Sequence, residues 1–323
     1  MEKRRDLFRE ILKYCHLCPR NCKVNREGGE IGFCQAGKKP KVFNYQIHRG
    51  EEPAISGKNG SGTIFFSYCS NRCIYCQNWR FSQRGEGEEV TIEELAEIML
   101  NLQEKNCHNL NLVTPTHYLP QILEALLIAV KAGFRLPLVY NTSGYENVEI
   151  LRLLEGIIDI YLPDMRYADD SIAYKYSLMK DYVRINQSAV TEMFRQVGNL
   201  VTKNGIAWRG LIIRHLILPN GLAGTKKIFD FIKRELSPKC FVSLMSQYYP
   251  FYKASQEPSL NRPITHEEYE KACKIMFVSG LENGWIQEEL DESTRKEFAG
   301  EYFKLSGRDS NITEDKKVDT DSD

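Results

Sequence analysis

Hydrophobic residues recur along the chain in two alternating patterns between about residues 62 and 250. Short apolar runs rich in β-branched and aromatic residues predict buried strands, and stretches with apolar residues every three or four positions predict helices. The six expected strands cover 62–69, 110–114, 138–140, 157–162, 211–218 and 240–245. The expected helices cover 91–105, 119–132, 148–154, 188–197, 225–236 and 266–281.

This alternation predicts an α/β fold with a parallel sheet, because each helix carries the chain back to the start of the next strand. Six strand–helix units favour a partial (β/α)6 TIM-like barrel over a closed barrel of eight units. A doubly wound open sheet is the alternative, and the lack of G-x-G-x-x-G after the first strand weakens it. Thr91 and Glu94 have the spacing of a capping box, so a helix should begin there.

The chain divides by composition into three parts. Residues 1–45 are short and Cys-rich, and so small a segment seldom folds without a staple, which predicts a metal-organised appendage. The predicted barrel spans 46–290. Residues 291–323 are polar and are predicted to be disordered, with an acidic interaction tail as the alternative.

Charge and hydropathy exclude several classes of protein. The 43 basic and 43 acidic side chains cancel, so nothing global favours binding to nucleic acid or to a membrane surface. No run of about 18 apolar residues predicts a membrane span, and the N-terminus lacks the apolar centre of a signal peptide. We therefore expect a cytoplasmic protein, in which thiols stay reduced and clustered cysteines indicate metal or catalysis.

Three of the ten cysteines form a compact motif, Cys69, Cys73 and Cys76, with the spacing C-x3-C-x2-C at the end of the first predicted strand. Three thiolates on one loop suit a [4Fe–4S] cluster and leave one iron without a protein ligand, open to a substrate. Active sites of barrels lie where strands end, as this loop does. A structural zinc site with a fourth ligand from elsewhere is the alternative.

Four more cysteines lie near the N-terminus with the spacing C-x2-C-x3-C-x11-C: Cys15, Cys18, Cys22 and Cys34. Four thiolates complete a tetrahedral set, so this motif predicts a closed second site. Structural zinc and an auxiliary iron–sulfur cluster both fit, and we favour a structural metal. The remaining three cysteines are isolated in apolar or helical sequence and are interpreted as packing residues: Cys107, Cys240 and Cys273.

The motif C-x3-C-x-aromatic-C, with Tyr75 as the aromatic residue, resembles the signature of the radical S-adenosylmethionine (SAM) superfamily. Its extension Cys76-Gln-Asn78 resembles the pyruvate formate-lyase activating enzymes. The upstream phrase HRGEEPAISGKNGSGTIFF (48–66) resembles the PflX-type branch of that group, as do the phrases at 192–198 and 214–219. The resemblance extends over roughly residues 15–285.

This resemblance implies a partial barrel in which SAM chelates the open iron through its amino and carboxylate groups. It also implies reductive cleavage of SAM to methionine and a 5′-deoxyadenosyl radical, which abstracts a hydrogen atom. An activating enzyme, an oxidoreductase of anaerobic metabolism, would take that hydrogen from a glycine of a partner protein. It would need a low-potential electron donor such as flavodoxin or ferredoxin. The cofactors carry the chemistry, and the protein orients them.

The resemblance also suggests cofactor-binding residues, among them Tyr75 in the cluster motif. Many relatives carry a glycine-rich GGE-like turn after the second strand, where this chain has Thr114-Pro-Thr116-His117. Thr116 or backbone carbonyls could replace that contact, and His117 is either a substrate-side acid or base or a polar helix-start residue. After the third strand, the short polar side chains Asn141 and Ser143 suit the cofactor's ribose and carboxylate; an ordinary turn is the alternative.

Charged residues follow the fourth strand and interrupt the fifth. Asp164 and Arg166 resemble an Asp-x-Lys pattern of activating enzymes, with Arg in place of Lys. Arg214 and His215 point to opposite faces of the fifth strand, so one of them should enter the barrel. The SAM carboxylate is a natural partner for Arg214, and a structural salt bridge is the alternative. Gln247 and Tyr248 are weaker candidates for lining the pocket.

Other functions remain open at this point. The same radical could modify a small molecule, another protein or RNA. A non-enzymatic iron–sulfur electron carrier belongs to a different class, but carriers normally bind all four irons through protein ligands. A zinc-organised binding module is the remaining alternative, which metal analysis would distinguish.

Overall fold

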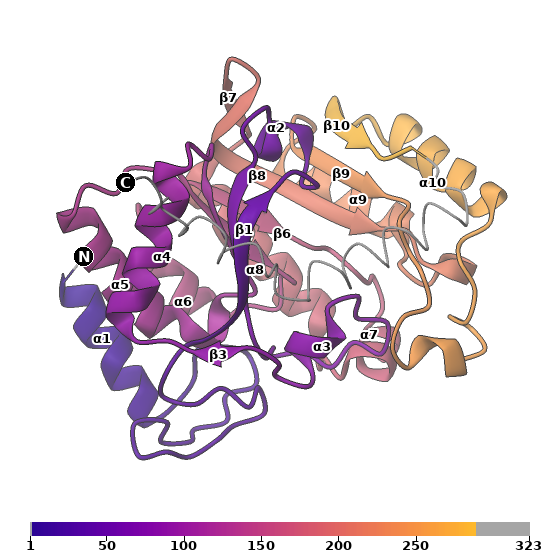
Figure 1. The fold of residues 1–323 in the computed structure, drawn as a ribbon. Helices are drawn as coiled ribbons and strands as arrows, with labels where there is room; N and C mark the ends of the chain where they lie inside the picture. Colours follow the sequence, from indigo (N-terminus) through magenta and orange to yellow (C-terminus); the bar gives the residue numbers. More distant parts are fainter. Residues whose placement is uncertain (1, 289–323) are drawn as a thin grey trace, which may run out of the picture.

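A computed structural model describes residues 2–288 and has a curved sheet at its centre (Figure 1). Six strands pair in parallel in chain order: β2 (Ser61–Phe66), β4 (Leu110–Val113), β5 (Leu138–Thr142), β6 (Ile160–Pro163), β8 (Ile206–Leu216) and β9 (Phe241–Met245). β10 (Asn283–Ile286) adds a further parallel strand beside β9. Within the described residues the two ends of the sheet do not meet, so the barrel is partial, as predicted.

Antiparallel strands extend the sheet at its margins, and the sequence patterns did not predict them. β1 (Lys41–His48) pairs with β2, and β3 (Glu88–Glu89) pairs with β1. β7 (Val201–Lys203) forms a hairpin with β8 that projects from the sheet (Figure 1). These strands are short or only partly apolar, which explains why they gave no strong hydrophobic period.

Helices connect the parallel strands, and all six expected ones are present: α4 (Ile92–Glu104), α5 (Leu119–Lys131), α6 (Val148–Arg152), α8 (Tyr182–Val197), α9 (Thr225–Phe231) and α10 (His266–Ser279). α9 continues as a π-helical turn, Ile232–Leu236. Four further helices lie outside the expectation: α1 (Glu2–Lys13), α2 (Pro53–Ser56), α3 (Trp79–Ser82) and α7 (Asp170–Ser177). No described helix combines the length and hydrophobicity that crossing a membrane requires.

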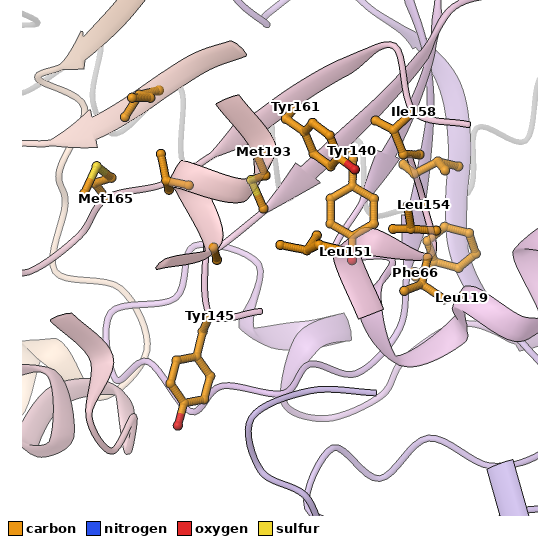
Figure 2. Packing of buried hydrophobic residues seen from close by; sticks show 14 of the residues in the cluster. Phe66, Leu119, Tyr140, Tyr145, Leu151, Leu154, Ile158, Tyr161, Met165 and Met193 are labelled. Carbon is orange, nitrogen blue, oxygen red and sulfur yellow. The ribbon is translucent and has the colours of Figure 1, made fainter. Parts of the chain in front are cut away.

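Alternation along the strands separates two apolar layers. Tyr140 on β5 and Tyr161 on β6 point toward the helices, and their ring centroids lie 5.8 Å apart (Figure 2). Val139 and Ile160, the neighbours of these tyrosines, belong to a smaller apolar cluster that also includes residues of β8. Asn141 shares its strand face with Val139, so the same alternation directs the Asn141 side chain into the barrel.

The N-terminal segment packs onto the barrel. α1 lies beside α5 (Figure 1), and its buried residues Phe8, Ile11 and Leu12 join the main hydrophobic core. The boundary near residue 45 remains a prediction, because the segment and the barrel share this core. The predicted polar tail, 291–323, lies outside the described residues.

The capping box of α4 is confirmed: the Thr91 hydroxyl accepts a hydrogen bond from the Glu94 amide at 3.1 Å, and the Glu94 carboxylate accepts one from the Thr91 amide at 2.6 Å. We expect Thr91→Ala to lower the free energy of unfolding by about 1 kcal/mol, because the Glu94 amide loses its acceptor. Urea denaturation would measure this. Thr202→Ala on exposed β7 is the control, expected within about 0.5 kcal/mol of wild type. Equal losses in the two variants would contradict the capping account.

Candidate active site

The three cysteines of the motif lie on the loop that follows β2, at residues 67–78. Cys73 is buried, and Cys69 and Cys76 are half-buried. The loop is fixed against α7 through its backbone: the Arg72 amide donates to the Ser177 carbonyl at 3.1 Å, and the Ile74 amide donates to the Tyr176 carbonyl at 2.9 Å. The loop is therefore part of the packed structure, at the edge of the barrel where the strands end.

Burial is the largest influence on these thiols. It raises the pKa of Cys69 to about 12 and the pKa of Cys76 to about 11, and in both cases the nearby Cys73 adds to the rise. The loop spacing C-x3-C-x2-C keeps the three thiols on one short segment, Cys69 to Cys76. Iron binds thiolate, so cluster assembly on this loop must displace the thiol protons.

Hydrogen-bond donors surround the sulfur atoms. Ser177 Oγ and Arg166 Nη1 each donate to Cys73 Sγ at 3.0 Å. The Ser82 hydroxyl lies 3.1 Å from Cys76 Sγ. Hydrogen bonds to the sulfurs of an iron–sulfur cluster tune its reduction potential, so this donor set fits a cluster at the three cysteines.

An ion-pair network leads from Cys73 into the barrel. Arg166 Nη2 donates to Asp164 Oδ2 at 2.6 Å, and Arg214 Nε donates to Asp164 Oδ1 at 3.1 Å. Burial alone would raise the pKa of Asp164, but the two guanidinium groups outweigh it and lower the pKa. The structure thus brings together Asp164 and Arg166, which follow one strand, and Arg214, which lies on the next.

Asn141 and Ser143 lie in the same region. The side-chain amide oxygen of Asn141, Oδ1, accepts a hydrogen bond from Arg214, and the Ser143 hydroxyl accepts one from the Asn71 side-chain amide at 2.5 Å. Asn71 belongs to the cysteine loop, so Ser143, the residue after β5, contacts the loop directly. The cofactor-binding roles of Asn141 and Ser143 remain predictions.

Two other candidates are engaged in packing interactions. Thr116 donates to the buried carboxylate of Glu146 at 2.7 Å, beside Tyr140 on the helix-facing side of the sheet. Burial raises the pKa of Glu146 to about 7, although its hydroxyl donors oppose the rise. The Tyr75 hydroxyl hydrogen-bonds the Tyr167 hydroxyl at 2.6 Å. Their cofactor contacts also remain predictions.

His117 is buried, and its Nε2 lies 2.8 Å from the Ser67 carbonyl oxygen at the start of the cysteine loop. Burial lowers the pKa of His117 to about 3. The ring is therefore neutral near pH 7, and this geometry favours the packing interpretation over an acid–base role. Tyr248 packs its ring 5.8 Å from Tyr75, and Gln247 accepts a hydrogen bond from Gln287 at 3.2 Å.

The four N-terminal cysteines lie near one another. Burial is the main cause of the raised pKa of Cys18, and the electrostatic influence of Cys34, Cys22 and Cys15 adds to it. All of them are free thiols. Within residues 2–288, no group of three or more His, Cys, Asp or Glu side chains is arranged to hold a single metal ion. The second metal site is therefore still a prediction. The three cysteines of the loop need not converge on a single metal ion, because each would bind a separate iron of the cube.

The N-terminal segment nevertheless contacts the cysteine loop. The guanidinium groups of Arg20 and Arg72 lie 3.9 and 4.7 Å from the centre of the Phe33 ring. Arg20 Nε also donates to the Ser70 carbonyl at 2.9 Å, and Arg72 donates to the Phe33 carbonyl. Phe33 immediately precedes Cys34, so the two cysteine motifs are joined through these three side chains.

Glu51 was not among the residues predicted from the sequence, yet its carboxylate accepts a hydrogen bond from Arg214 Nη1 at 3.3 Å. Glu51 and Glu52 are adjacent acidic residues before the first strand of the barrel. Glu52 is buried, and the Glu51 side chain is 8% exposed. The only signal was this acidic pair in a phrase otherwise rich in glycine and apolar residues. Nothing in the local pattern indicated that the pair would turn into the barrel.

Comparison with known proteins agrees with this site. Residues 63–175 match the Radical SAM superfamily. Uncharacterized protein MJ0674 of Methanocaldococcus jannaschii is 35% identical over 280 residues, covering 84% of this chain and 76% of the relative. Uncharacterized protein MJ0808 of the same organism is 25% identical over 294 residues, covering 84% and 80%. The chain belongs to the radical SAM superfamily.

A solved structure of methylornithine synthase is also similar to this chain. The TM-score is 0.48 at 18% identity, and the match covers 74% of this chain and 69% of that one. The superfamily implies a [4Fe–4S] cluster and SAM, and the cysteine loop described above has the donor set for the cluster.

Proposed function

We propose that this protein is a radical SAM oxidoreductase that cleaves SAM reductively at a [4Fe–4S] cluster on Cys69, Cys73 and Cys76. The main support is the contact of Cys73 with Arg166, which is itself paired with Asp164, so that charged side chains adjoin the three-cysteine loop. When bound, the cluster supplies the electron that divides SAM into methionine and a 5′-deoxyadenosyl radical. An electron carrier normally binds all four irons through protein ligands, whereas a three-cysteine loop leaves one iron open.

The residues of the chain orient the cofactor and keep water from it. Arg214 is only 16% exposed at its side chain and can pair with the SAM carboxylate at the inner face of the barrel. Asn141 and Ser143 offer short polar groups for the ribose, and Asp164 holds both arginines in place. These groups are fixed before SAM binds, so little ordering is needed on binding.

For the substrate, we propose hydrogen abstraction from a glycine of a partner protein, in the manner of pyruvate formate-lyase activating enzymes. The Cys76-Gln-Asn78 extension and the phrase at 48–66, which resembles the PflX-type branch, support this. Modification of a small molecule, another protein or RNA by the same radical is the second candidate. Either reaction would take its electron from flavodoxin or ferredoxin under anaerobic conditions in the cytoplasm.

Metal analysis of anaerobically reconstituted protein tests the proposal. After incubation with iron and sulfide, we expect about four irons per chain if only the cysteine loop holds a cluster, and about eight if the N-terminal cysteines hold a second one. Four irons together with one zinc would support a structural N-terminal site. Zinc without iron and sulfide would contradict the enzyme proposal and favour a zinc-organised binding module.

Cys18→Ala tests the role of the N-terminal cysteines. If they hold a structural metal, the variant should lose that metal and some stability while it retains part of its SAM cleavage, because the cysteine loop is intact. Metal content, melting temperature and 5′-deoxyadenosine formation are measured together, with Cys240→Ala as a control for loss of a buried thiol. Complete loss of cleavage in a folded variant would indicate an essential electron relay instead.

A further inference from the structure

Glu51 lies inside the barrel although it comes from the segment before β2. It accepts a hydrogen bond from Asn111 Nδ2 on β4 at 2.8 Å and a long one from Asn141 Nδ2 on β5 at 3.5 Å. On the opposite side it receives Arg214 Nη1 of β8 at 3.3 Å. The carboxylate thus spans three strands, and its side chain is 8% exposed.

From Glu51, a continuous chain of charged contacts reaches the cysteine loop. Arg214 bridges Glu51 and Asp164, through its Nη1 and Nε atoms respectively. Arg166 in turn bridges Asp164, at 2.6 Å, and Cys73 Sγ, at 3.0 Å. Each arginine donates hydrogen bonds to two partners: Arg214 to Glu51 and Asp164, and Arg166 to Asp164 and Cys73. Losing the Glu51 charge should therefore change the strength of the hydrogen bond from Arg166 to Cys73.

We propose that Glu51 is a positioning residue of the cluster site, which acts on Cys73 through Arg214, Asp164 and Arg166. The proposal rests on the proposed function, because it requires Cys73 to be a cluster ligand. With Glu51 present, Arg214 is shared between two carboxylates, and Asp164 remains available to hold Arg166. Without the Glu51 charge, Arg214 keeps its hydrogen bond to Asn141 Oδ1 and interacts more strongly with Asp164. Asp164 then holds Arg166 less strongly, and Arg166 donates a stronger hydrogen bond to Cys73.

Loss of the Glu51 charge should shift the midpoint potential of the cluster in the same direction by two routes. Removing a buried negative charge leaves the site more positive, and a stronger hydrogen bond to Cys73 stabilises the reduced cluster, which carries more negative charge. Loss of the Glu51 charge should therefore make the midpoint potential of the cluster more positive. The effect should not be a general result of disturbing a buried carboxylate elsewhere in the protein.

A redox titration monitored by electron paramagnetic resonance, on reconstituted protein without SAM, tests this. We expect a more positive midpoint potential in Glu51→Gln and a value near that of wild type in Glu51→Asp, which keeps the charge. Glu192→Gln is the control: it removes a carboxylate that pairs with Arg195 at 2.8 Å on α8. Its midpoint potential should equal that of wild type. Melting temperatures are measured in parallel.

These measurements distinguish the role of Glu51 from the proposed function of the protein. An unchanged potential in a folded, fully loaded Glu51→Gln protein would overturn the role of Glu51 and leave the proposed function intact. Equal shifts in the Gln and Asp variants would show a merely structural role and overturn it as well. If Glu51→Gln does not fold, Arg214→Gln breaks the same link from the other side and should shift the potential in the negative direction; no shift would overturn the proposal. Wild-type protein that assembles no cluster would overturn the proposed function itself.

Discussion

Cys73→Ala should abolish SAM cleavage while the barrel still folds. Cys73 is the buried member of the three-cysteine loop and the one that receives hydrogen bonds from both Arg166 and Ser177. Without its thiolate, two cysteines remain for a cluster that needs three protein ligands, so we expect loss of the cluster and 5′-deoxyadenosine at background levels. Iron content, the electron paramagnetic resonance signal and product formation measure the loss.

Cys273→Ala provides the control, because Cys273 is a half-buried cysteine on α10, far along the chain from the loop. This variant should retain its iron and its cleavage activity. Circular dichroism should show that both variants are folded. A folded Cys73→Ala protein that still cleaves SAM would contradict the assignment of the motif.

Asp164→Asn should have the second large effect, on stability as well as on the site. The carboxylate lies between the guanidinium groups of Arg166 and Arg214, and its side chain is 11% exposed. An amide leaves two half-buried guanidinium groups without this partner, which should lower the free energy of unfolding at pH 7 by about 3 kcal/mol, the lower end of the cost of breaking a buried pair. Urea denaturation would measure it. Asp181→Asn, in an exposed pair with Arg184, should cost less than about 1 kcal/mol.

The stabilisation from Asp164 should also depend on pH. Its pKa is lower in the folded protein than in the unfolded chain, where it is about 3.9. The stabilisation is therefore fully present above the unfolded pKa and is lost as the pH falls through the folded pKa. The difference between wild type and Asp164→Asn should stay constant from pH 7 to about pH 5 and shrink below that. A difference that grew at acidic pH would contradict the account.

Much of the barrel could be predicted from sequence because its strands and helices carry strong periodic signals. β6 and α4 illustrate this: β6 is a continuous apolar run, and α4 has an apolar stripe and a complete capping box. β1 was missed because it is only partly buried, and β10 because it is an exposed edge strand. α1 was missed because its polar residues conceal the three that pack against α5.

Residues of the candidate site could be predicted where their position on or after a strand brings them to the site. Asp164 and Arg166 follow one strand, Arg214 lies near the end of the next, and the three lie together in the structure. Thr116 has the same kind of position, yet its hydroxyl turns to Glu146, a partner thirty residues away that no local pattern identifies. Glu51 was missed for a related reason, since its contacts with Arg214 and Asn111 exist only after the barrel has formed.

The most direct test of the central claim is the formation of 5′-deoxyadenosine. Anaerobically reconstituted protein is incubated with SAM and dithionite, and the product is quantified by chromatography with mass detection. Our account predicts 5′-deoxyadenosine and methionine in equal amounts, dependent on reductant and absent when Cys69, Cys73 or Cys76 is replaced. A fully loaded cluster that yields no 5′-deoxyadenosine, even when cell extract is added to supply a substrate, would contradict it.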